Sequence, residues 1–235
     1  MANPPSARTG RTRAPRASRV DSELRERPLV QAAISRSLGH RYDTAADEVS
    51  RLVESAYRVI ERAGTVDPRM REILADAGLS TQAFYRHFPS KDDLLLVLLD
   101  DGARRLADYL THQMAKATTA KGRIRAWIEG VLAQAIDAEA AARTRPFLAN
   151  LARLAERYPE AQQAQIETVV APLVAAVRDA AKAGDARSSD PGADARAIYH
   201  LAMGGMEAHV LARTSPTKRE VNQVVSFALR AIGAG

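Results

Sequence analysis

Residues 69–88 read RMREILADAGLSTQAFYRHF, and this stretch contains two short helical patterns separated by a tight turn. In both patterns the apolar residues recur at three- and four-residue steps, which is the spacing of one helix face. Gly78 stands at the turn, where its lack of a Cβ allows the left-handed backbone conformation. Two short helices joined this closely are the layout of a helix-turn-helix. The positions predicted to face inward are Ile73, Leu74, Ala77, Leu79, Phe84 and Phe88.

The opposite side of the second predicted helix is chemically suited to DNA. Gln82 can pair with adenine and Arg86 with guanine, and Thr81 offers a hydroxyl and a methyl group to thymine. Tyr85 can donate to a phosphate, and the N-terminus of a helix favours phosphate through its free N–H groups. On these residues alone, a surface hairpin that binds nothing is the alternative.

The run from Ile73 to Lys91 resembles the DNA-binding domain of the TetR family of bacterial one-component regulators. That family typically reads Ile-Ala, then Ala-Gly-Val-Ser, then Tyr-x-His-Phe with a Lys three residues later. The present chain has Ile73, Ala77-Gly78-Leu79-Ser80, Tyr85-Arg86-His87-Phe88 and Lys91. The detailed match covers residues 42 to 95, and the remainder agrees in length and helical character.

The resemblance implies roles at individual positions. Thr81, Gln82 and Arg86 would face base edges, and the others would hold or approach phosphates, except Ser80, which would cap the recognition helix. Relatives often have Gly at position 82 and a hydroxyl residue at position 83, where this chain has Gln82 and Ala83. A different base preference follows, so no known operator can be transferred. The residues implied at the DNA interface are Arg69, Ser80, Thr81, Gln82, Tyr85, Arg86, His87 and Lys91.

Composition excludes several classes of protein. The 235 residues include no cysteine, which excludes a disulfide scaffold and a thiolate metal site. The formal net charge is +6, with 46% hydrophobic and 26% charged residues, as in soluble globular proteins. No run approaches the roughly 20 apolar residues of a membrane span. Since no apolar segment follows the N-terminal arginines, a secretory signal is excluded too, and we expect a cytoplasmic protein.

Positive charge is concentrated at the N-terminus. Residues 1–41 hold nine arginines and three acids, whereas residues 42–102 hold seven bases and twelve acids. The first segment has too few large apolar residues to form a core, so it is predicted to be a largely disordered arm. Basic arms are common in nucleic-acid-binding proteins, although a solubilising leader is an equal alternative. The arm residues expected to touch DNA are Arg11, Arg13 and Arg16.

The sequence predicts an all-α fold. Strong helix formers dominate after residue 41, and alternating strand patterns are missing. Asp67 and Ser90 are each expected to cap the helix that follows. We therefore expect a basic arm (1–41), a three-helix DNA-binding domain (42–90) and a larger helical domain (91–235). The nine predicted helices are 45–63, 68–76, 80–88, 91–116, 121–142, 145–157, 160–182, 193–213 and 217–231.

The TetR resemblance implies that the C-terminal helices form a ligand pocket. The expected ligand is an apolar or amphipathic small molecule, lipid-like or an acyl thioester, bound between helices 91–116 and 193–213. For Trp127 and Asn150 a place in the core is the alternative. The residues predicted to line the pocket are Trp127, Val131, Phe147, Asn150 and Met203.

A homodimer is expected through the last two predicted helices, as the resemblance implies. The small-residue segment Ala202 to Gly205 would allow close helix approach. A two-fold dimer matches a palindromic operator on double-stranded DNA, and repression is the default of the family. The apolar stripe assigned to the dimer consists of Val221, Val224, Val225, Ala228 and Leu229.

Other functions find little support in the sequence. There is no Gly-x-Ser-x-Gly, phosphate-binding glycine loop or paired carboxylate, so an enzyme is not expected. His200, Glu207 and His209 cannot share one helix face, so neither a metal nor a cofactor is expected. A membrane-surface binder would need a basic amphipathic helix beside the arm, and the segment 29–38 is too weakly basic.

Overall fold

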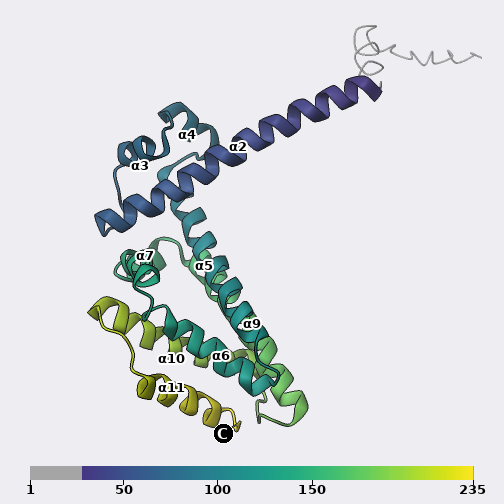
Figure 1. Ribbon diagram of the computed structural model, residues 1–235, viewed down its shortest axis with the longest axis vertical. Coiled ribbons are helices and arrows are strands. Elements are labelled where there is room, and N and C mark those ends of the chain that lie inside the picture. The colour runs from purple at the N-terminus through teal and green to yellow at the C-terminus, as the bar shows by residue number, and fades with distance from the viewer. Residues whose placement is uncertain (1–27, 235) are drawn as a thin grey trace, which may run out of the picture. The chain divides into compact units, whose positions relative to one another are not determined.

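The computed structural model describes residues 28–234, and all regular secondary structure in this part of the chain is helical (Figure 1). Ten helices are present there, against the nine predicted, and none of them is long and apolar enough to cross a membrane. The helices are α2 (Pro28–Ala63), α3 (Met70–Ala77), α4 (Thr81–His87), α5 (Lys91–Ala115), α6 (Ala120–Ala133), α7 (Ala138–Leu148), α8 (Leu151–Arg157), α9 (Pro159–Ala183), α10 (Pro191–Ala212) and α11 (Lys218–Ala231).

The chain divides into two compact units, one ending at Val49 and the other beginning at Ser50. Helix α2 starts at Pro28, much earlier than the predicted residue 45, so residues 28–41 of the expected arm are helical. Proline favours the first turn of a helix, and the sequence that follows is rich in helix formers. The rest of the predicted arm, with Arg11, Arg13 and Arg16, lies outside the described residues.

Within the second unit, α3 and α4 pack on the last turns of α2. Phe84 is fully buried, and its ring stacks on that of Phe88 with 5.5 Å between centroids. Gly78 ends α3 with a φ of 63°, in the left-handed region. The side chains that form this core are Leu52, Ala56, Val59, Ile60, Ile73, Leu74, Ala77, Phe84 and Phe88.

Two of the three predicted caps are present. The Ser80 and Ser90 hydroxyls accept hydrogen bonds from the backbone N–H groups of Ala83 and Asp93, at 3.1 and 3.3 Å. The Asp67 cap is wrong, because α3 begins at Met70 after Arg69, with no side-chain cap. The Asp67 carboxylate pairs instead with Lys91, a partner that is distant in the sequence.

The C-terminal helices form one core. Helices α5, α6, α9 and α10 pack against one another, and α11 covers α6 (Figure 1). Gly130 marks the close approach of α6 to α5, since a Cβ there would lie 2.7 Å from a methyl group of Leu110. Much of the stripe predicted for dimerisation is buried within its own subunit. The members of that stripe buried in this core are Val225, Ala228 and Leu229.

The predicted helices 121–142 and 145–157 are replaced by α6, α7 and α8. Asp137 starts α7, because its carboxylate accepts the N–H groups of Glu139 and Ala140 at 2.9 Å. Pro146, taken as a boundary, lies inside α7. The helix ends only after it, where Asn150 donates through its side chain to the Pro146 carbonyl at 2.8 Å. Side-chain capping therefore decides these boundaries.

Replacing Gly78 by Ala should lower the free energy of unfolding by about 1–2 kcal/mol, because an L-residue is strained in the left-handed region. The added Cβ would also lie 3.1 Å from Arg51 Nη2. Urea unfolding followed by circular dichroism measures the change. Gly39→Ala is the control, since this helical glycine has open space around it; it should be neutral or stabilising by up to ~1 kcal/mol. Equal effects of the two substitutions would contradict the assigned turn.

Candidate DNA interface and ligand cavity

Helix α4 presents the side chains predicted to read DNA. Thr81, Gln82, Tyr85 and Arg86 are all exposed, while the opposite face of the helix is buried in the core. The Ser80 hydroxyl accepts a hydrogen bond from a backbone N–H at the start of the helix, and the polar face of the helix remains exposed. This surface combines hydroxyl, amide and guanidinium groups, the side chains that pair with base edges in a major groove.

The residues predicted to hold phosphates have different surroundings. Arg69 is exposed before α3, and His87 is half-buried at the end of α4. Lys91 forms an ion pair with Asp67, and its hydrogen bond holds the pKa of that carboxyl below its ordinary value. A DNA phosphate would therefore compete with Asp67 for the Lys91 ammonium.

Arg51 of α2 holds the turn of the motif, a role that the sequence analysis missed. Its Nη2 and Nε donate to the Ala77 carbonyl at 2.6 and 3.1 Å, and Nη2 reaches the Gly78 carbonyl at 3.3 Å. These carbonyls close α3, where the helix dipole is negative and a cation is favoured. Because the residues are 26 and 27 positions apart, no local pattern reveals the contact.

A second tie joins α2 to the last turn of α3. Arg58 and Arg62 donate to the two oxygens of Asp76 at 2.7 and 3.0 Å. The hydrogen bond from Arg58 is the main reason that the pKa of Asp76 lies below its ordinary value. The recognition helix is thus carried on a turn that α2 holds at two points.

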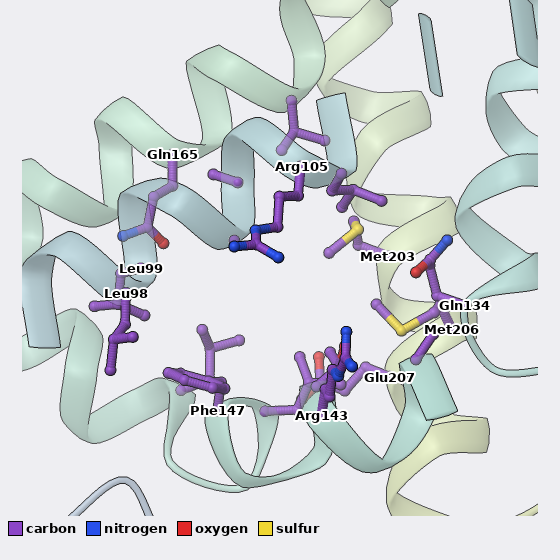
Figure 2. Close-up of a pocket in the computed structure, with 18 of the residues that line it drawn as sticks. Leu98, Leu99, Arg105, Gln134, Arg143, Phe147, Gln165, Met203, Met206 and Glu207 are labelled. Carbon is purple, nitrogen blue, oxygen red and sulfur yellow. The ribbon is translucent and has the colours of Figure 1, made fainter. Parts of the chain in front are cut away.

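A cavity of about 1210 Å³ lies between the C-terminal helices and the last turns of α2 (Figure 2). Phe147 and Met203, both predicted to line the pocket, are on its wall. Helices α5 and α10, the pair predicted to enclose the ligand, both contribute. Within residues 28–234, no group of three or more His, Cys, Asp and Glu is placed to hold a metal ion.

Three residues predicted for the pocket do not line this cavity. Trp127 is 0% exposed in the core, where its Nε1 donates to the Val169 carbonyl at 3.3 Å. Val131 is also fully buried. Asn150 turns back to the Pro146 carbonyl and closes α7. Periodicity identified the apolar helix faces but could not separate core positions from cavity positions.

Tyr57 connects the DNA-binding helices to the cavity, and the sequence analysis missed it. This α2 residue lines the cavity and donates from its hydroxyl to the Leu98 carbonyl of α5 at 2.6 Å. Its ring lies 6.2 Å from that of Phe147, and the Arg105 guanidinium lies 5.7 Å from the ring centroid. Burial raises the pKa of Tyr57, so the phenol remains a neutral donor.

Helix α8 makes a second connection between the cavity and the DNA-binding helices. Leu154 and Tyr158 line the cavity at the end of α8. Arg157, between them, forms an ion pair with Asp92 in the first turn of α5. Asp92 directly follows Lys91, a residue predicted to hold phosphate. The cavity wall and the residues predicted to bind DNA are therefore joined by contacts between neighbouring elements.

Comparison with known proteins agrees with this geometry. Residues 52–98 match the model of the family described as bacterial regulatory proteins, tetR family. This segment contains the end of α2, the helix-turn-helix and the start of α5. Among curated protein sequences, none matches significantly.

Solved structures share the fold at low sequence identity. A TetR transcription regulator from Haloarcula marismortui is 19% identical with a TM-score of 0.64, covering 80% of this chain and 98% of its own. NemR of E. coli in its reduced form is 18% identical with a TM-score of 0.65, covering 80% and 99%. RolR in complex with resorcinol is 14% identical with a TM-score of 0.59, covering 82% and 90%.

The exposed polar face of α4 and the tight turn that carries it define a DNA-binding domain of the helix-turn-helix class. Proteins with this domain and fold are transcriptional regulators and not enzymes. The family-model match over residues 52–98 and the shared fold narrow the class of protein further. The helix-turn-helix segment, residues 52–98, belongs to the tetR family, and the described chain as a whole shares its fold with solved structures of such regulators. Regulators of this family bind DNA, and they typically respond to small molecules and act as dimers.

Replacing Arg86 by Ala should weaken binding to a selected DNA duplex by about 1–3 kcal/mol and relax the preference at one base pair, because one base contact is lost. Fluorescence anisotropy at fixed salt measures the affinity for the selected duplex and for single-base variants of it. The control is Gln163→Ala, an exposed substitution on α9 that should leave binding unchanged. A uniform loss across all base variants would instead assign Arg86 to a phosphate.

Proposed function

We propose that this protein is a ligand-responsive repressor that binds a palindromic operator as a homodimer and acts in the cytoplasm. The observation that carries the proposal is the cavity wall formed by Tyr57, because the same helix supports the turn before the recognition helix. A molecule in the cavity would therefore touch the support of the DNA-binding element directly. Repression is the default mode of the family, and the proposal includes it on that basis.

Release from DNA requires only that the ligand binds the DNA-free arrangement of the protein more tightly than the DNA-bound arrangement. A ligand that fits the DNA-free arrangement better shifts the population toward it, by no more than that difference in affinity. The cavity is mainly apolar, with Leu98, Phe147 and Met203 on its wall, and this supports an apolar or amphipathic effector. RolR, which shares the fold, has been solved with the small molecule resorcinol.

The proposed dimer forms through the outward faces of α10 and α11. Phe227 is 57% exposed and Leu211 42% exposed, so both offer apolar surface to a partner subunit. A Cβ added to Gly204 of α10 would meet no described atom within 4 Å, and this glycine also lines the cavity. Gly205, by contrast, faces Leu132 of its own subunit. Two helices from each subunit would form a four-helix contact.

The proposal is tested by selecting bound duplexes from a random library with the full-length protein. A dimer that reads DNA with two copies of α4 should enrich inverted half-sites about one helical turn apart, or a multiple of it. Enrichment of a single unrepeated site would refute the palindromic operator. Failure to enrich any sequence would refute sequence-specific binding.

Phe227→Arg should separate the dimer, because a charge would be buried at the proposed contact. The expected loss is about 2 kcal/mol or more in association free energy, as for a central interface residue. Multi-angle light scattering over a concentration series measures the mass, and circular dichroism shows that the subunit stays folded. Val97→Arg is the matched control, since Val97 is a 39% exposed apolar residue on α5, outside the proposed contact. A wild-type protein that is monomeric at micromolar concentration would contradict the dimer.

The basic arm is proposed to contact phosphates beside the operator. Residues 42–102 are net acidic, so the helix-turn-helix domain has few uncompensated cations of its own. The five arginines within residues 1–20, among them Arg11, Arg13 and Arg16, would supply positive charge. Each phosphate neutralised adds about 0.9 to the slope of log affinity against log salt.

Deleting residues 1–20 should therefore weaken DNA binding and flatten its salt dependence, with little change in base preference. If two or three arginines per subunit engage, the slope for a dimer should fall by roughly four to five. Titrations of the selected operator at several salt concentrations measure this slope. Parallel plots for the full-length and truncated proteins would show that the arm serves only solubility.

A further inference from the structure

The charged groups around the cavity are unequally compensated. Three arginines line it, and each already has a carboxylate partner. Arg105 lies 2.7 Å from Asp101, Arg143 lies 2.6 Å from Glu139, and Arg58 lies 2.7 Å from Asp76. The positive charge on the wall is therefore largely neutralised before any ligand enters.

Glu207 of α10 differs from these groups. It lines the cavity and is half-buried, and its side chain makes no ion pair or hydrogen bond within residues 28–234. Figure 2 shows Glu207 and Arg105 on opposite sides of the cavity. A carboxylate that is partly withdrawn from water without a partner is electrostatically costly, and a positive ligand would relieve that cost.

Polarisable and aromatic groups line the same cavity as Glu207. Met203 and Met206, on the same helix, also line the cavity (Figure 2). Tyr199 is close enough that, in addition to burial, the charge of Glu207 raises the pKa of its phenol. Phe147 and Tyr57 complete an aromatic wall. Aromatic faces and thioethers attract an organic cation, and the Tyr57 hydroxyl is already engaged with the Leu98 carbonyl.

We propose that the cavity binds an organic cation, a protonated or quaternary ammonium or a similar onium group on an apolar body, with the charge held by Glu207. The inference rests on the proposed effector function and specifies the chemical class of the effector. An acyl thioester or lipid-like molecule, as expected from the sequence, would place negative charge against an uncompensated carboxylate if its head group is anionic. The volume of about 1210 Å³ accommodates an apolar body of several rings.

The test uses two probes of nearly the same size and shape, tetraphenylphosphonium and tetraphenylborate, which differ in the sign of their charge. Isothermal titration of the full-length protein should give saturable binding of the phosphonium. The borate should bind at least tenfold more weakly. Equal or tighter binding of the borate, or no saturable binding of the phosphonium at millimolar concentration, would overturn the inference.

Glu207→Gln removes the charge and keeps the shape of the side chain. Because no group within residues 28–234 pairs with this carboxylate, the unliganded variant should melt at the wild-type temperature or above it. Its affinity for the phosphonium should fall at least tenfold, with little change for the borate. Glu160→Gln is the matched control, an exposed acid in the first turn of α9 that does not line the cavity. An unchanged phosphonium affinity in the Glu207 variant would refute the role of Glu207.

Operator binding, measured with and without the phosphonium, separates this inference from the proposed function. Glu207-dependent binding that leaves operator affinity unchanged would support the cation site and refute its effector role. Operator binding by a protein that takes up no cation would refute the cation site and leave the proposed DNA-binding function standing.

Discussion

The structure depends on how the end of α3 is closed against α2. Phe84 anchors the recognition helix in a fully buried position, but apolar packing alone does not orient a two-helix turn. The Arg51 guanidinium adds direction, because it satisfies the carbonyls of Ala77 and Gly78 that the helix leaves free. The exposed face of α4 is therefore presented by a rigid turn, and its side chains need little further ordering to meet a groove.

The same helix explains how DNA reading and ligand binding can be linked. One part of α2 supports the turn through Arg51, and further along the same helix Tyr57 enters the cavity wall. A helix transmits displacement along its axis because its backbone hydrogen bonds are continuous. The ion pair of Arg157 with Asp92 provides a second connection, but it is partly exposed and contributes little stability alone. The packed contacts of Tyr57 are therefore the stronger mechanical link.

The cavity shows that each charged side chain on its wall must be considered together with its ion-pair partner. Arg105 is prominent on the wall and by itself would indicate an anionic ligand. Its neighbour Asp101 and the ring of Tyr57 already occupy that guanidinium. Glu207 is the less conspicuous group, yet it determines the net preference because its carboxylate is not paired within the described part of the chain. Specificity in such a cavity follows from the charges that remain uncompensated.

The sequence by itself determined the helix-turn-helix, the cap at Ser80, the left-handed Gly78 and the exposed reading face, since each depends on residues within one or two helical turns. It also determined the all-helical class. Only the tertiary structure decided that Lys91 meets Asp67, that Arg51 closes α3, and that Trp127 belongs to the core while Tyr57 reaches the cavity. These contacts join residues far apart in the chain, and helical periodicity identifies an apolar face without specifying what that face will touch.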